Sequence, residues 1–121
     1  MNWTLLSLLF AAVALVLMVR SSSTLPAADA RRLLQSGGMV VDVRTEEEHR
    51  ADPVAGSVNL PLDGVVAAVS KRFPSKDTPL LLHCRSGARS DVALQRLTAV
   101  GYRNVHNLGG VEKARRVVDR I

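Results

Sequence analysis

Four short apolar runs, separated by helical patterns, constrain the fold of this chain more than any other feature of its sequence. The runs are MVVDV, SVNLP, LLLH and NVHNL, at residues 39–43, 57–61, 80–83 and 104–108. The third is apolar throughout, as is typical of a strand buried on both faces. Strands that alternate with helices in this way predict a three-layer α/β domain with a mainly parallel central sheet.

Five segments around these runs predict helices, at residues 26–38, 45–50, 62–73, 88–100 and 109–121. The first opens with Pro26 and closes at Gly37, which agrees with the residue preferences of helix ends. Thr45 is a candidate cap for the second, and the acids that follow it lie in the first turn. The last three carry apolar stripes: Leu62, Val65, Val66, Val69 and Phe73, then Ala93, Leu97 and Val100, then Val111, Ala114, Val118 and Ile121.

An uncharged apolar segment at residues 3–19 precedes this pattern. As a helix it would span roughly 25 Å, close to the short limit for a hydrocarbon core of about 30 Å. We predict a transmembrane anchor at residues 1–20, a linker at 21–25 and one domain at 26–121. A cleaved signal peptide is the alternative, because PAADA at residues 26–30 offers a weak cleavage site. No Lys or Arg precedes the apolar run, which disfavours that alternative.

The distribution of positive charge predicts an orientation for the anchor. Arg20, Arg31 and Arg32 follow the apolar segment, and no Lys or Arg precedes it. The positive-inside rule then places the N-terminus outside and the domain on the cytoplasmic side of a single-pass membrane protein.

The net charge of +5 suits an anionic partner but does not identify one. One Trp, one Tyr and two Phe offer few faces for base stacking, which disfavours binding of single-stranded nucleic acid. Lys113, Arg115 and Arg116 are expected on the solvated face of the last helix, where contact with acidic lipid is an additional role to consider.

The single cysteine, Cys84, directly follows the strand at residues 80–83 and precedes a turn of small residues. Ligands bind at the carboxyl ends of strands in open α/β sheets, and a turn into a helix N-terminus aims backbone amides into its own concavity. Those amides, together with Arg85 and Arg89, favour the thiolate, which is the nucleophilic form of cysteine. We therefore predict that Cys84 is a nucleophile, against the alternative of a small buried apolar side chain.

Three sequence motifs resemble those of one protein family. CRSGARS at residues 84–90 resembles the active-site loop of the rhodanese family, the single-domain thiosulfate and persulfide sulfurtransferases. Residues 41–62 are similar to that family's Asp-x-Arg strand end, acidic helix and Gly-Ala-x-Asn-Ile-Pro segment. NVHNLGGV at residues 104–111 is similar to its last strand and Gly-Gly turn. From Pro26 onward, the motifs stand in the order that the family shows.

The resemblance implies a function for the loop. Cys84 would take the outer sulfur of thiosulfate or of a persulfide and pass it to a thiol, such as a protein thiol, or to cyanide. Arg85 and Arg89 would attract the anionic donor, and no metal or organic cofactor would be needed. The backbone amides that would cradle the bound sulfur belong to Arg85, Ser86, Gly87, Ala88, Arg89 and Ser90.

Two other functions stay open at this point. Some phosphatases share this fold, but their loop has five residues between Cys and Arg, and here Ser90 stands where that arginine would be. The shorter loop favours a sulfur atom over a tetrahedral phosphate. The second alternative is a non-catalytic rhodanese-like module that recruits a partner at the membrane.

Three residues near the predicted loop have supporting or structural interpretations. Asp42 and Arg44 point to the same face at a strand end, where they could support the site; a structural ion pair is the favoured interpretation. His83 precedes Cys84 in an extended segment, so its side chain is expected to face the other way and to pack in the strand.

Overall fold

A four-stranded sheet, all of whose neighbouring strands are parallel, forms the centre of the domain. The computed structural model describes residues 2–22 and 24–121, with the backbone alone over residues 16–22. The strands are β1 (Met39–Asp42), β2 (Val58–Asn59), β3 (Leu80–His83) and β4 (Val105–Gly109), in the order β2-β1-β3-β4. Each strand lies within or next to its predicted run, so the parallel α/β prediction is confirmed.

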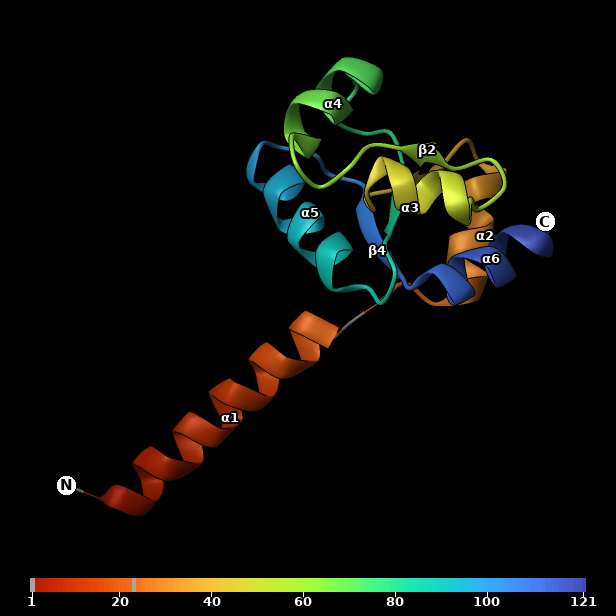
Figure 1. The fold of residues 1–121 in the computed structure, drawn as a ribbon. Helices are drawn as coiled ribbons and strands as arrows, with labels where there is room; N and C mark the ends of the chain where they lie inside the picture. Colours follow the sequence, from red (N-terminus) through yellow and green to blue (C-terminus); the bar gives the residue numbers. More distant parts are fainter. Residues whose placement is uncertain (1, 23) are drawn as a thin grey trace.

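Two helices cover each face of this sheet (Figure 1). On one face lie α2 (Ala27–Gln35) and α6 (Val111–Asp119), and on the other lie α4 (Val65–Arg72) and α5 (Ala88–Ala99). A short helix, α3 (Glu46–Ala51), follows β1 and buries none of its residues. The structure therefore has the three predicted layers, and α3 remains free to supply polar side chains.

The core consists of two clusters, one on each face of the sheet. Strand residues such as Val41 and Leu82 pack against α4 and α5, whereas Val40 and Leu81 pack against α2 and α6. Alternation along β1 and β3 thus places successive side chains in opposite clusters. LLLH is fully buried, as its continuous apolar run predicts.

The ends of two predicted apolar stripes are wrong. Val100 is 43% exposed and Ile121 is 61% exposed, because α5 and α6 end before these residues. Val117, which the predicted stripe omitted, is fully buried beside Ala114. A periodic pattern continued past the end of a helix no longer reports burial.

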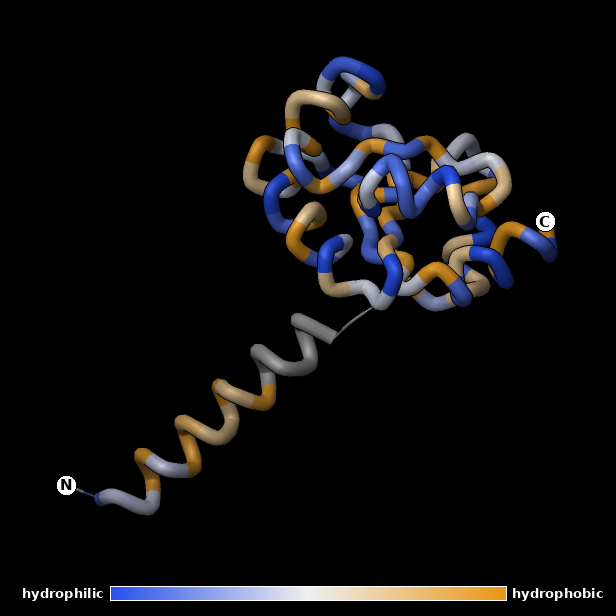
Figure 2. Tube along the Cα trace, viewed as in Figure 1, coloured by the Kyte–Doolittle hydropathy of each residue, from blue (hydrophilic) through white to orange (hydrophobic). Residues whose placement is uncertain are grey.

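The N-terminal segment forms the helix α1 (Trp3–Ser22), which extends away from the other elements in Figure 1. Its described residues are mostly apolar, as the orange tube of Figure 2 shows, and Trp3 and Phe10 are more than 70% exposed. Among the described residues, none of the helices combines the length and apolar content needed to span a bilayer. The transmembrane anchor predicted at residues 1–20 is therefore not supported. The part of that prediction that rests on side chains 16–20 lies outside the described residues.

The strand order reverses direction between β1 and β3. From β1 the chain continues to β2 on one side, and from β3 it continues to β4 on the other. Ligands of open α/β sheets bind outside the carboxyl ends of the strands at such a reversal. Arg44 follows the end of β1 closely and Cys84 follows the end of β3, so both lie at this edge.

Candidate active site

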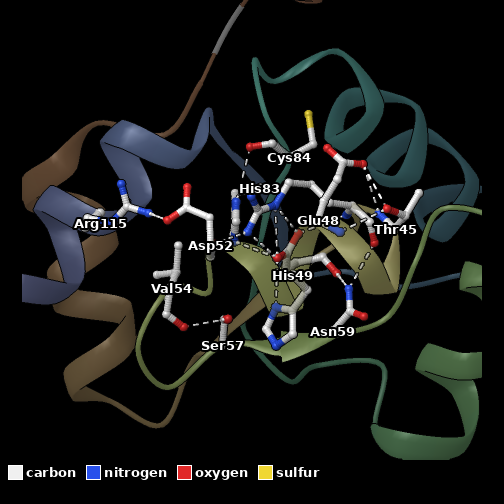
Figure 3. Close-up of polar contacts among 12 residues, drawn as sticks. Thr45, Glu48, His49, Asp52, Val54, Ser57, Asn59, His83, Cys84 and Arg115 are labelled. Atoms are coloured by element: carbon white, nitrogen blue, oxygen red, sulfur yellow. Dashed lines mark hydrogen bonds and ion pairs between the residues drawn. The ribbon is translucent and has the colours of Figure 1, made fainter.

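Cys84 lies at the base of the loop that joins β3 to α5. Its backbone N–H donates to the carbonyl of Gly109, with 3.1 Å between nitrogen and oxygen. The residue is only 1% exposed and belongs to the core cluster on the α4 and α5 side. Figure 3 shows its sulfur directed away from His83. The candidate nucleophile is therefore shielded from bulk water by its own loop.

Hydrogen-bond donors surround the Cys84 sulfur. The amide of Gly87 lies 3.0 Å from Sγ, and the Ser90 hydroxyl oxygen lies 3.6 Å from it. Burial is the largest single influence on the pKa of Cys84 and raises it. Hydrogen bonds from the Ser90 amide and hydroxyl, and from the amides of Ser86 and Gly87, lower it, so that the pKa lies below its ordinary value. The loop thus favours the thiolate, as the sequence predicts.

The Ser90 hydroxyl has one proton but three acceptors within reach. The oxygen lies 2.7 Å from Asn107 Oδ1, 3.0 Å from the Gly87 carbonyl and 3.6 Å from Cys84 Sγ. The shortest contact is the strongest hydrogen bond, so the hydroxyl donates its proton to Asn107 Oδ1 in preference to the sulfur. Backbone amides are therefore the main donors to the thiolate.

Asn107 connects β4 to the loop, a role that the sequence did not reveal. Its Nδ2 donates to the Gly87 carbonyl at 3.1 Å, and its Oδ1 accepts from the Gly109 amide at 3.0 Å. It lies one residue before Leu108 in a short apolar run, where nothing in the sequence distinguishes it from a packed strand residue. Only the neighbouring strands reveal that it holds the loop.

Two glycines fix the shape of the loop. Gly87, the N-cap residue of α5, has a φ of +98°, a left-handed conformation that disfavours residues with a Cβ. At Gly110, a Cβ would lie 2.8 Å from the Arg85 carbonyl oxygen, closer than real contacts allow. Ser86 forms an antiparallel bridge with Gly110 at this point. The loop after β3 therefore rests directly on the Gly-Gly turn after β4.

The two predicted loop arginines have different surroundings. Arg89 binds Glu48 through two hydrogen bonds, Nη1 to Oε1 at 2.7 Å and Nη2 to Oε2 at 2.9 Å. This hydrogen bond with Arg89 is the main cause that lowers the pKa of Glu48 to about 2, so Glu48 is ionised across the physiological range. The charge of Arg89 is therefore balanced. Arg85 is exposed and forms no ion pair with any residue whose side chain the structure describes.

Glu48 is a functional candidate that the sequence analysis missed. It belongs to a capping box at the start of α3, in which the Glu48 amide donates to Thr45 Oγ1 at 3.2 Å. Its side chain accepts in return from the Thr45 amide at 3.3 Å. Thr45 is thus confirmed as the cap. The spacing Thr-x-x-Glu is a known signal for such a box and could have placed Glu48 in the first turn of α3.

Asp42 and Arg44 form a buried ion pair behind the loop. Arg44 Nη2 lies 2.8 Å from Asp42 Oδ2 and also donates to the Asp52 carbonyl at 2.7 Å. His49 Nδ1 lies 2.9 Å from the same Asp42 oxygen. Burial raises the pKa of Asp42, but hydrogen bonds from Arg44 and His49 outweigh it and lower the pKa. The ion-pair interpretation is confirmed, and Asp42 is fully buried.

His83 packs beside this pair, on the side opposite the thiol, as predicted. Its Nδ1 lies 3.2 Å from the Cys84 carbonyl oxygen, and its Nε2 lies 3.8 Å from Asp42 Oδ2. Burial lowers the pKa of His83, so the ring is neutral at pH 7. Among the residues that the structure describes, no group of three or more His, Cys, Asp or Glu side chains is arranged to hold a metal ion.

A cavity of about 240 Å³ opens between α3 and the start of α6. It is lined by Arg44, Glu48, Ala51, Asp52, Arg85 and Val111. Arg85 joins this cavity to the loop that holds the thiol. A small anion could therefore approach the edge of the site beside an arginine whose charge is not balanced.

Comparison with known proteins gives one consistent result. The family model described as a rhodanese-like domain matches residues 26–116. The chain is similar to thiosulfate sulfurtransferase PspE of Escherichia coli K12, with 32% identity over 72 residues, covering 60% of this chain and 69% of that protein. It is also similar to thiosulfate sulfurtransferase 18 of Arabidopsis thaliana, with 37% identity over 94 residues, covering 67% of this chain and 68% of the relative.

A solved structure agrees with these sequence relationships. The structure of a rhodanese with anions from Escherichia coli superposes with a TM-score of 0.60 at 30% sequence identity. The match covers 63% of this chain and 89% of that one. The likeness therefore extends over most of the E. coli protein.

Proposed function

The chain belongs to the rhodanese-like domain family, and from this premise we propose that it transfers sulfane sulfur through a persulfide on Cys84. The chain is a sulfurtransferase enzyme, in agreement with its relatives. The observation that carries the mechanism is the single thiol whose pKa is lowered by the surrounding loop amides. A thiolate held in this way is a ready nucleophile.

In the first step, the Cys84 thiolate attacks the outer sulfur of thiosulfate. A bond forms between Sγ and that sulfur, while the sulfur–sulfur bond of thiosulfate breaks and its electron pair leaves with sulfite. The product is a Cys84 persulfide anion, and the total charge is unchanged. The amides of residues 85–90, among them those of Ser86, Gly87 and Ser90 that lower the pKa of the thiol, would then hold the terminal sulfur.

In the second step, a thiolate or cyanide attacks the outer sulfur of the persulfide. The bond between the two sulfurs breaks, and its electron pair returns to Sγ as the thiolate. The acceptor leaves as a persulfide or as thiocyanate. A persulfide donor can replace thiosulfate in the first step, because its outer sulfur has the same oxidation state.

Arg85 is the residue that would attract the anionic donor. It is exposed at the cavity beside the loop, whereas the charge of Arg89 is already matched by Glu48. We assign Arg89 a positioning role: through Glu48 it ties the start of α5 to α3. Asp42 and Arg44 would support the edge of the site from behind.

The experiment that tests this function uses the full chain and the Cys84→Ser variant. Each is incubated with thiosulfate, freed of excess reagent and weighed by intact-protein mass spectrometry. We expect the wild type alone to gain one sulfur, and cyanide or a thiol to release it. If the wild type gains no sulfur from thiosulfate or from glutathione persulfide, the alternative of a non-catalytic recruiting module replaces this proposal.

Cellular location is a separate proposal. We propose that the domain lies on the cytoplasmic side, as the positive charge after residue 19 predicts. Attachment to a membrane through residues 3–19 stays a prediction. A reporter fused after Ile121 that is active only outside the cytoplasm would contradict the orientation, and recovery of the chain in the soluble fraction would contradict the attachment.

A further inference from the structure

A second cavity, lined by cations, lies between α2 and α6. Its volume is about 390 Å³, and its lining residues are Ala27, Arg31, Lys113, Arg116, Val117 and Arg120. Every charged residue in this lining is basic. None of the lining residues belongs to the Cys84 loop or to the cavity beside it, so this α2–α6 cavity is a different site.

The four cations converge because of the helix geometry. Lys113 and Arg116 lie three residues apart on α6, and Arg120, four residues further, is its C-cap, so the three share one side of that helix. Arg31 faces them from α2, which packs against α6. Val117 is fully buried at the apolar wall of the cavity. The result is a concave site with an apolar wall and a ring of positive charge.

Two of the three acidic residues of α2 and α6 pair with other cations, and the third, Asp119, forms no ion pair with a described residue. Asp29 of α2 pairs with Arg32, and Glu112 of α6 pairs with Arg115. Within the part of the chain that the structure describes, none of the four cavity cations takes part in an ion pair. Their charge is therefore not balanced by the protein residues described.

Two side chains of the cavity lie in unfavourable surroundings. Arg31 Nε is buried, and among the described residues it has no hydrogen-bond partner. A buried donor without an acceptor is unfavourable. Lys113 donates to Thr24 Oγ1 at 3.0 Å and to the Leu25 carbonyl at 2.5 Å, yet burial and the charge of Arg116 lower its pKa. An anion in the cavity would relieve both effects.

We propose that the α2–α6 cavity binds a phosphate-bearing anion. Three guanidinium groups and one ammonium group offer many donors, and the planar guanidinium fork matches the oxygens of a phosphate group in pairs. Ala27 is the first residue of α2, and no side chain caps that helix end. The backbone amides at the start of α2 therefore add further hydrogen-bond donors for an anion. The phosphate could belong to a soluble compound or to a lipid headgroup.

The test measures binding by the full chain, with no reference to sulfur transfer. The cavity variant is Arg116→Gln with Arg120→Gln, both exposed residues. The matched control, Lys71→Gln with Arg72→Gln, removes the same charge from two exposed residues in the last turn of α4. Pyrophosphate is titrated calorimetrically at low salt. Separately, flotation is compared between vesicles of phosphatidylcholine alone and vesicles containing phosphatidic acid.

We expect saturable binding that weakens about tenfold or more in the cavity variant, because a charge-assisted hydrogen bond is lost. The control should bind like the wild type. If the cavity variant binds pyrophosphate more weakly than the wild type, a soluble phosphate is a sufficient ligand. If the loss of binding is confined to phosphatidic acid vesicles, the ligand is a lipid headgroup. Equal losses of binding in both variants would overturn the proposal. It would also be overturned if the wild type neither binds pyrophosphate nor floats better with phosphatidic acid vesicles than with phosphatidylcholine vesicles. Sulfur loading of Cys84 should be the same in all three proteins.

Discussion

The carboxyl ends of β1 and β3 are neighbours in the sheet, yet their polar groups are arranged in opposite ways. At the end of β1, Arg44 and His49 both bind Asp42, and the charges of Asp42 and Arg44 balance. At the end of β3, backbone amides surround one sulfur atom and bring no negative charge of their own. The first arrangement is closed, whereas the second needs an anion to complete it.

The same sheet edge therefore has a structural part at the end of β1 and a reactive part at the end of β3. A closed ion cluster resists rearrangement, because removal of Asp42 or Arg44 leaves a buried charge without a partner. An open ring of donors stabilises whichever negative group enters it, first a thiolate and then a persulfide. The comparison can be tested from both sides, beginning with the closed cluster.

The largest expected effect is on stability, at Asp42. Asp42→Asn leaves the Arg44 charge buried and unbalanced, so we expect the free energy of unfolding to fall by about 3–5 kcal/mol. Denaturant titration measures the change. Asp77→Asn is the matched control, because Asp77 also binds an arginine, Arg103, but at an exposed position. It should leave the stability nearly unchanged. Equal losses in the two variants would contradict the view of a closed buried cluster.

The next effect concerns the open ring, at Gly87. Gly87→Ala strains a left-handed position whose amide lies 3.0 Å from Cys84 Sγ. We expect the rate of thiol alkylation at pH 7 to fall about tenfold, which corresponds to one lost charge-assisted hydrogen bond. The alkylation profile should also move to higher pH, because the amide that lowers the pKa of Cys84 is displaced.

Gly64→Ala supplies the control for that measurement. Gly64 has a φ of +76° and open space where a Cβ would stand, so it carries similar backbone strain far from the thiol. Alkylation should be unaffected in Gly64→Ala. If both variants react like the wild type, the Gly87 amide has no part in activating the sulfur.

A smaller effect distinguishes the two loop arginines. Arg85→Gln should raise the KM for thiosulfate about fivefold, since it removes a cation that is not balanced at the edge of the site. Arg89→Gln should change this KM less, because Glu48 already matches its charge. Glu48→Gln frees the charge of Arg89 and should lower the KM. A larger change of KM in Arg89→Gln than in Arg85→Gln would reverse the assignment.

The smallest effect is the pH dependence of stability that His83 contributes. Burial lowers the pKa of His83 in the folded state, so the unfolded chain binds its proton first as the pH falls. This contribution is complete above pH 6.5 and is lost below it, by at most about 1.4 kcal/mol per pH unit. The free energy of unfolding should therefore decrease less between pH 7 and 5 in His83→Gln than in the wild type. His106→Gln should act in the same direction, because burial lowers the pKa of His106 as well.

The sequence predicted the sheet and the place of the thiol well, for physical reasons. LLLH is a short, continuous apolar run, which is typical of a strand buried on both faces, and Cys84 directly follows it. Local patterns also sufficed for the Thr45 cap and for the Asp42–Arg44 pair, whose members are two residues apart. Such contacts depend on spacing along the chain, which a sequence displays directly.

Contacts between distant segments could not be obtained in this way. Arg89 meets Glu48 across 41 positions, and Ser90 meets Asn107 across 17. Without the packing of α3 and β4 around the loop, the two arginines Arg85 and Arg89 look equivalent. The sequence therefore assigned both to the anionic donor, whereas the structure balances one of them internally.

The dependence of the loop on β4 also determines when the environment of the thiol forms during synthesis. Gly109 accepts from the Cys84 amide, the Arg85 carbonyl accepts from the Val111 amide at 3.3 Å, and Asn107 holds Gly87. During synthesis, residues 84–90 leave the ribosome well before residues 105–111. The nascent thiol therefore emerges without its final environment, and only the arrival of β4 turns an ordinary cysteine into an activated one.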